Sequence, residues 1–222
     1  MGFGQLPYDV AHLLGGGMLL LSFMLLYQRR VGAVVSVLAA QGGLLALAAA
    51  WQGFVQGAPQ LYLTALIAAV AKAVCIPLAL RWTIRRLALA RGVDTALGIG
   101  PSLMAGVALV ALAIMVALPV TSAAQALARE DLAMALSIVL LGMLMMITRR
   151  NAILQVVGLM SLENGLVLAA VGVAGMPLVV ELSTAALVML LLVVAGIFVF
   201  QMRERLDSLD IALLHPHRGE HE

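Results

Sequence analysis

Long apolar stretches, separated by short polar or Gly/Pro-rich connections, run through almost the whole chain. A helix needs about 20 apolar residues to cross the hydrocarbon core of a bilayer. The sequence therefore predicts an all-α membrane protein with seven transmembrane helices, at residues 8–27, 31–55, 60–80, 98–120, 132–148, 152–173 and 178–202. The composition agrees, because 64% of the residues are hydrophobic and 11% are charged, against roughly 45–50% and 25% in a soluble domain.

The arginines predict the orientation of these helices. One side of the expected membrane carries Arg29, Arg30, Arg81, Arg85, Arg86, Arg91, Arg149, Arg150, Arg203, Arg205 and Arg218, and the other side carries Arg129 alone. Because short cytoplasmic loops are enriched in Lys and Arg, we expect the N-terminus outside and the C-terminus in the cytoplasm. This topology accounts for the modest net charge of +2, so no nucleic-acid partner is predicted.

The single lysine of the chain, Lys72, lies in the middle of the apolar run 60–80. An ammonium at bilayer depth costs roughly 3 kcal/mol on insertion scales, and unlike a guanidinium it can lose its proton. Lys72 precedes Arg85 by the same number of residues that separates Glu163 from Arg150. At 1.5 Å per residue both charges lie roughly 20 Å from the cytoplasmic arginines, near the bilayer midplane.

A lysine and a glutamate at one depth on different helices favour proton handling, since intramembrane ionisable residues are functional by default. Two other interpretations stay open: a structural ion pair that fixes helix packing, and a lysine that snorkels to an interface. Further polar residues extend the candidate proton path. They are Glu181, Asp9 and His12 toward the outer side, and Gln41 and Asn164 near the depth of the pair.

The surroundings of Lys72 and Glu163 fit a polar path. Pro77 follows Lys72 by five residues and removes the helix hydrogen bond to the carbonyl of Ala73, which is then free to bind water. On the run that holds Glu163, Gly158 and Gly165 thin the helix. For these glycines we favour close helix packing over a role in the path.

A short pattern occurs twice, as Gln41-Gly42-Gly43-Leu44 and as Glu163-Asn164-Gly165-Leu166, each after an Arg-Arg pair. It suggests two parallel three-helix copies, in which Gln41 is the neutral counterpart of Glu163, although apolar sequences also match by chance. We divide a single polytopic membrane domain, 1–222, into helices one to three (1–92), helix four (98–120), helices five to seven (131–207) and a cytoplasmic tail (208–222).

Several motifs occur together in this chain: Arg149-Arg150-Asn151 leading to Gly158-Leu159, Glu163-Asn164-Gly165, Lys72 before Ile76-Pro77, Val180-Glu181-Leu182, and Leu206-Asp207-Ser208-Leu209-Asp210. In this combination the chain resembles the hydrogenase-4 component E family over nearly its whole length. Its last three runs are more distantly similar to the K-type subunit of bacterial respiratory complex I. Two positions depart from these patterns, with Met160 in place of the K-type glutamate and Leu187 where an acid is often found.

The resemblance implies a non-catalytic membrane-arm subunit of an energy-converting complex related to group 4 [NiFe] hydrogenases, in a bacterial or archaeal cytoplasmic membrane. Such complexes couple redox chemistry to proton or sodium movement. The implied partners are antiporter-like and quinone-site-like membrane subunits and a cytoplasmic redox arm. The nickel–iron centre and iron–sulfur clusters are expected in those partners, with no cofactor, metal or catalytic residue in this chain.

Three other functions share parts of this pattern. A stand-alone ion transporter uses similar buried charges, and a purely structural scaffold needs neither Lys72 nor Glu163. A retinal protein holds its chromophore on a lysine of the last helix, and the run 178–202 has none. The sequence shows no catalytic triad, metal-ligand cluster or phosphate-binding loop, and the single Cys75 excludes an internal disulfide.

Overall fold

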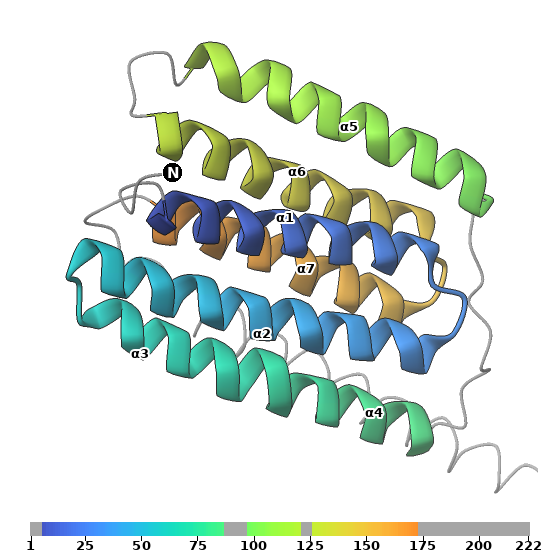
Figure 1. Ribbon diagram of the computed structural model, residues 1–222. Coiled ribbons are helices and arrows are strands. Elements are labelled where there is room, and N and C mark those ends of the chain that lie inside the picture. Colours follow the sequence, from blue (N-terminus) through green and yellow to red (C-terminus); the bar gives the residue numbers. More distant parts are fainter. Residues whose placement is uncertain (1–5, 87–96, 121–125, 173–222) are drawn as a thin grey trace, which may run out of the picture. The chain divides into compact units, whose positions relative to one another are not determined.

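The computed structural model describes residues 6–86, 97–120 and 126–172, all of which lie in one compact unit, Met1–Val180. These residues form helices and no strand, which confirms the all-α class for the described ranges (Figure 1). The elements are α1 (Leu6–Tyr27), α2 (Val31–Gln56), α3 (Gln60–Ile67), the π-helix η1 (Ala68–Cys75), α4 (Ile76–Arg86), α5 (Ile99–Val120), α6 (Ala126–Thr148) and α7 (Ala152–Gly172).

Five helical spans are long and apolar enough to cross a membrane: Pro7–Tyr27, Val31–Gln56, Gln60–Arg85, Ile99–Ala117 and Ile153–Gly172. In α6 the apolar part, Leu132–Thr148, is shorter. These six agree in position with the first six runs expected from the sequence. The seventh run, 178–202, and the tail, 208–222, lie outside the described residues, as does Glu181.

Helices α1, α2, α6 and α7 pack together, and α2 also contacts α3, η1 and α4. At one end, the Gln56 side chain of α2 donates a hydrogen bond to the carbonyl of Val171 in α7, at 3.0 Å. At the same end, Trp51 Nε1 of α2 donates to the carbonyl of Pro7 in α1. These contacts show that α2 and α7 run in the same direction and that α1 runs opposite to α2. The suggested repeat stays a prediction, because the third run of its second copy is not described.

Glycines bring α6 and α7 into close contact. A Cβ at Gly142 of α6 would lie 2.6 Å from the backbone nitrogen of Leu162, and one at Gly158 of α7 would lie 3.0 Å from the carbonyl oxygen of Gly142. A Cβ at Gly165 would lie 2.9 Å from the carbonyl oxygen of Ala135. Any larger residue would force the two backbones apart. The close packing that we expected at Gly158 and Gly165 is therefore present.

A π-helical segment interrupts the third expected span. Within η1 the turns are wider than in an α-helix, and the N–H of Ile76 bonds to the carbonyl of Ala71, five residues back. The next residue, Pro77, has no N–H, and its ring clashes with the carbonyl four residues earlier in a regular helix. A wide turn just before the proline relieves that clash, and such π turns occur most often at functional sites.

Arg149, between α6 and α7, ties the ends of two helices together. Its Nη2 donates to the carbonyls of Leu25 (3.1 Å) and Leu26 (2.6 Å), in the last turn of α1. Those carbonyls have no partner within their own helix, and a cation there also complements the helix dipole. The side chain is buried, and this burial lowers the pKa of Arg149. The two carbonyls offset part of the cost of burying the charge.

Candidate functional site

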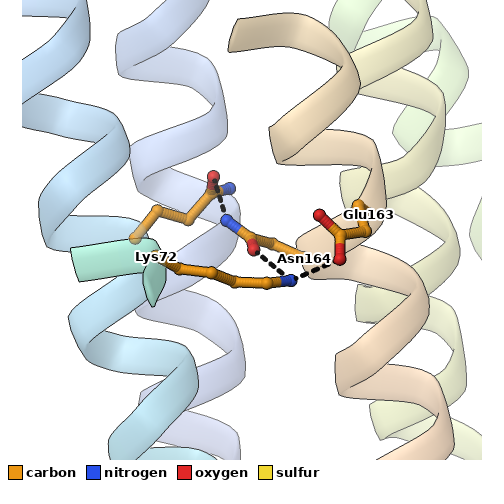
Figure 2. Close-up of polar contacts among 4 residues, drawn as sticks. Lys72, Glu163 and Asn164 are labelled. Atoms are coloured by element: carbon orange, nitrogen blue, oxygen red, sulfur yellow. Dashed lines mark hydrogen bonds and ion pairs between the residues drawn. The ribbon is translucent and has the colours of Figure 1, made fainter. Parts of the chain in front are cut away.

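Lys72 lies inside the helical bundle, in the π-helical segment η1. It is only 4% exposed, and η1 packs against α2. The four-carbon stem of lysine carries the ammonium from this position to α7. The snorkelling interpretation is wrong, because the ammonium points into the protein and not toward an interface (Figure 2).

The ammonium of Lys72 forms an ion pair with Glu163 of α7. Nζ lies 3.0 Å from Oε1, and the two side chains are 4% and 3% exposed. Buried charges are tolerated when they are paired and hydrogen-bonded. Since the two residues are in contact, they lie at the same level of the helical bundle, which agrees with their equal spacing from Arg85 and Arg150. Their depth in the membrane stays a prediction.

Asn164, next to Glu163 on α7, supplies the second acceptor for Lys72. Nζ donates to its Oδ1 at 3.1 Å, so one ammonium bridges two consecutive residues of one helix (Figure 2). The other atom of that amide, Nδ2, donates to Oε1 of Gln41 in α2, at 3.2 Å. Gln41 is completely buried. Three of the sequence candidates thus join Lys72 in one group.

Two serines complete the group. Gln41 Nε2 donates to Ser22 Oγ of α1 at 2.8 Å and to Ser161 Oγ of α7 at 3.1 Å. Ser22 in turn donates to the carbonyl of Met18, one helical turn earlier. We call the residues Ser22, Gln41, Lys72, Ser161, Glu163 and Asn164 the central polar cluster. It links α1, α2, η1 and α7, and its hydrogen bonds satisfy both side-chain amides.

Glu163 is the least satisfied member of the central polar cluster. Its Oε1 faces the Lys72 ammonium at 3.0 Å, whereas Oε2 has no hydrogen-bond partner among the described residues. A buried acceptor without a donor costs free energy in the carboxylate form. The Lys72 ammonium beside Oε1 offsets part of this cost. Glu163 is therefore the member of the cluster with room for a further hydrogen-bond donor, at Oε2.

Gly42 of α2 lets η1 approach closely enough for these contacts. A Cβ at residue 42 would lie 2.8 Å from the carbonyl carbon of Lys72, 2.9 Å from its oxygen and 3.0 Å from the nitrogen of Ala73. All three are backbone atoms, which cannot rotate away. The next glycine, Gly43, has no atom within 4 Å of the equivalent position. The position of the π-helical turn thus depends on one glycine of the pair.

Two further candidates lie apart from the central polar cluster. Asp9 and His12 are in the first half of α1, where Asp9 is exposed. Along a helix, His12 lies about 15 Å from Ser22. The hydrogen bonds and the ion pair described above for the central polar cluster do not include Asp9 or His12. In the described part of the chain, no group of three His, Cys, Asp or Glu residues is arranged to hold a metal ion.

Sequence reasoning did not single out Ser22. Serine is common in transmembrane helices because it can bond to the carbonyl four residues earlier, as Ser22 does. The sequence signal for it was weak, since no charged residue accompanies it on α1 at that depth. Ser161 lies two residues before Glu163 in the sequence, but its contact with Gln41 depends on which helices are neighbours.

Comparison with known proteins gives one informative match. The chain is similar to a protein of Mycobacterium tuberculosis (strain ATCC 25618 / H37Rv) named Uncharacterized protein Rv0085, with 27% identical residues over 198 positions. The alignment covers 88% of this chain and 90% of the mycobacterial protein. No protein-family model matches the chain. No solved structure matches it either. The similarity thus extends over nearly the full length of both chains.

Proposed function

We propose that this chain is a non-catalytic membrane-arm subunit of an energy-converting, hydrogenase-type complex, in which it contributes to redox-coupled proton translocation. The observation that carries the proposal is the buried 3.0 Å pair between Lys72 and Glu163, formed by residues of two different helices. Multi-pass character is supported by the five apolar spans. The link to the hydrogenase-4 component E family rests on the sequence motifs around Lys72, Glu163 and Arg149.

The pair supports a simple proton cycle. In the resting state an ammonium and a carboxylate stabilise each other's charge. When a proton reaches Oε2 of Glu163, the carboxyl becomes neutral and Lys72 loses its ionic partner. Lys72 can then release its own proton, after which Glu163 passes its proton to Lys72 and both groups recover their charges. One proton enters at Glu163 and one leaves from Lys72 in each cycle.

The proposal also assigns an orientation in the membrane and neighbouring subunits to the chain. The arginine-rich end of the described helices faces the cytoplasm in our proposal, and Glu181, Asp9 and His12 serve on the outer side. The membrane is a bacterial or archaeal cytoplasmic membrane. Antiporter-like and quinone-site-like subunits lie beside the chain, and the redox arm that holds the nickel–iron and iron–sulfur centres lies in the cytoplasm. Sodium is an alternative coupling ion.

The test compares ion movement with redox rate in proteoliposomes that contain the purified complex. Glu163→Gln keeps an acceptor oxygen for Lys72 but cannot take a proton, so we expect an assembled complex with near-normal redox rate and reduced proton uptake. Lys72→Met has the same expected effect. Lys72→Arg should restore proton uptake only partly, because a guanidinium keeps a positive charge but does not release its proton. Ser137→Ala is the matched control, since Ser137 is buried in α6 and, among the described residues, its hydroxyl donates to the carbonyl of Ala133 of the same helix.

Two results contradict the proposal in different ways. If Glu163→Gln and Lys72→Met assemble and pump at the wild-type ratio of protons to electrons, the pair is structural and the chain is a scaffold. If the chain alone transports protons in liposomes, it is a stand-alone transporter. Mass spectrometry of the complex that co-purifies with the chain identifies the partners, and we expect other multi-helix membrane subunits among them.

A further inference from the structure

A row of hydrogen bonds leads from Lys72 to α1, and every donor in it points the same way. Lys72 Nζ donates to Asn164, Asn164 Nδ2 donates to Gln41, and Gln41 Nε2 donates to Ser22. Ser22 then donates to the backbone carbonyl of Met18. A carbonyl only accepts, so the last bond of the row cannot be reversed. Once this last bond is fixed, each side-chain amide before it must donate with its nitrogen toward Ser22 and accept with its oxygen on the side of Lys72.

The direction of the row matters at Lys72. With its hydroxyl hydrogen on Met18, Ser22 presents an oxygen that accepts from Nε2 of Gln41. Gln41 therefore turns its Oε1 toward Asn164, and Asn164 turns its own Oδ1 toward the ammonium. If either amide rotated by 180°, the N–H₂ group of Asn164 would face Lys72. An ammonium has three donors and no acceptor, so it gains nothing from a second donor group.

The same row is a poor route for protons. Proton transfer at an active site uses groups that titrate, such as His, Asp, Glu, Lys or Tyr, or water chains. The row between Lys72 and α1 consists of two side-chain amides and a serine hydroxyl already committed to a carbonyl. Among the described residues, Glu163 is the one titratable group that faces Lys72. Its Oε2 is buried and has no hydrogen-bond partner among the described residues, so it is the atom of the pair that can still take a donor.

We infer that Ser22 and Gln41 are positioning residues for Lys72. Acting through Asn164, they hold an acceptor oxygen against the ammonium, which keeps the resting pair charged. They also close the α1 side of the pair, so that protons reach it through Oε2 of Glu163. This inference rests on the proposed proton transfer, although the orientation of the row can be tested without any partner subunit.

The single lysine of the chain makes that test direct. The purified full chain, labelled with 15N at the lysine side chain and placed in lipid nanodiscs, gives one side-chain ammonium signal, that of Lys72. In the wild type we expect a protonated Nζ whose hydrogens exchange slowly with water. Gln41→Met removes all three hydrogen bonds of the Gln41 amide without adding charge. It should shift the signal in the same direction as Glu163→Gln does and speed up the exchange of its hydrogens.

Ser22 supplies the second variant and a rescue. Ser22→Ala should shift the Lys72 signal less than Gln41→Met, because Ser161 still accepts from Gln41. Ser22→Thr keeps a hydroxyl that bonds to the carbonyl of Met18, and it should restore the wild-type signal. Ser137→Ala should leave the signal unchanged. A purely structural effect of a lost serine would appear equally in Ser22→Ala and Ser137→Ala.

The inference is overturned if folded Gln41→Met gives the wild-type Lys72 signal. Should Gln41→Met fail to fold, Ser22→Ala decides in its place, and a wild-type signal there overturns the inference. Failure of the proposed function looks different. If Glu163→Gln pumps normally in the complex while the Lys72 signal responds to Gln41→Met and Ser22→Ala, the row orients Lys72 but the pair carries no protons.

Discussion

Gly42→Ala should move the π-helical turn that holds Lys72. The added methyl carbon would lie 2.8–3.0 Å from three backbone atoms of Lys72 and Ala73. Carbon atoms in optimal contact are roughly 3.5–4.0 Å apart, so η1 and α2 must separate by about 1 Å. Backbone atoms cannot rotate aside. The displacement therefore reaches the ion pair, which is the reason that this variant tests function and stability together.

Gly43→Ala is the matched control for that change. Both glycines lie in the interior of α2, and replacing either by alanine favours the helix by up to about 1 kcal/mol. That contribution cancels when the two variants are compared. The remaining difference is the cost of overpacking, typically about 1–3 kcal/mol, because the space at Gly43 is open. We expect Gly42→Ala to be less stable than Gly43→Ala by this amount.

The assay is unfolding of the purified chain in mixed micelles with increasing SDS, followed by circular dichroism. The difference in free energy of unfolding between the two alanine variants gives the packing term. In the complex, Gly42→Ala should also reduce proton uptake, whereas Gly43→Ala should not. Equal stability and equal uptake for both variants would refute the claim that Gly42 positions Lys72.

Three further outcomes are expected. Gly142→Ala should destabilise the chain by about 1–3 kcal/mol in the same assay, whereas Gly32→Ala, which adds its methyl group in open space, should not. Arg149→Met should lower the free energy of unfolding by about 3–6 kcal/mol, because Arg149 donates two hydrogen bonds and each bond from a charged donor contributes roughly 1.5–3 kcal/mol. A loss below about 0.5 kcal/mol, the range of ordinary surface substitutions, would contradict the role assigned to it. Single cysteines at Gln28 and Gln60, in an otherwise cysteine-free chain, should be labelled from the cytoplasmic and outer sides respectively; the opposite pattern would invert the orientation that the arginines predict.

The helices and the central pair were predictable because simple rules govern them. An apolar run of membrane length leaves few alternatives to a helix, and the equal spacing of Lys72 from Arg85 and of Glu163 from Arg150 predicted that the two charges lie at one level. That spacing says nothing about which helices are neighbours. The pair could be expected at one level in the membrane, but the contacts of Gln41 with Asn164 and Ser22 came only from the packing of α2 between α1 and α7.

Other features had sequence signals that pointed to something else. From Pro77 the sequence predicted a regular helix with one missing hydrogen bond. The structure instead has a π-helix, η1, with wider turns just before the proline. Arg149 fitted the pattern of cytoplasmic arginines, which described its side of the membrane but not its role at the end of α1. That role depends on residues 123 and 124 positions earlier in the chain. A local sequence pattern cannot predict a contact between residues that lie so far apart in the chain.

The separation of Lys72 from its partners has a consequence for how the protein is made. Asn164 follows Lys72 by 92 residues, so at 5–20 residues per second the ribosome needs about 5–20 s to deliver it. During that interval the newly inserted helix carries an ammonium with no acceptor on α7. Insertion of α7 is therefore the step that completes the ion pair, because it delivers both Glu163 and Asn164. A chain truncated before α7 keeps an uncompensated cation within the bilayer, a feature by which membrane quality control can distinguish it from the finished protein.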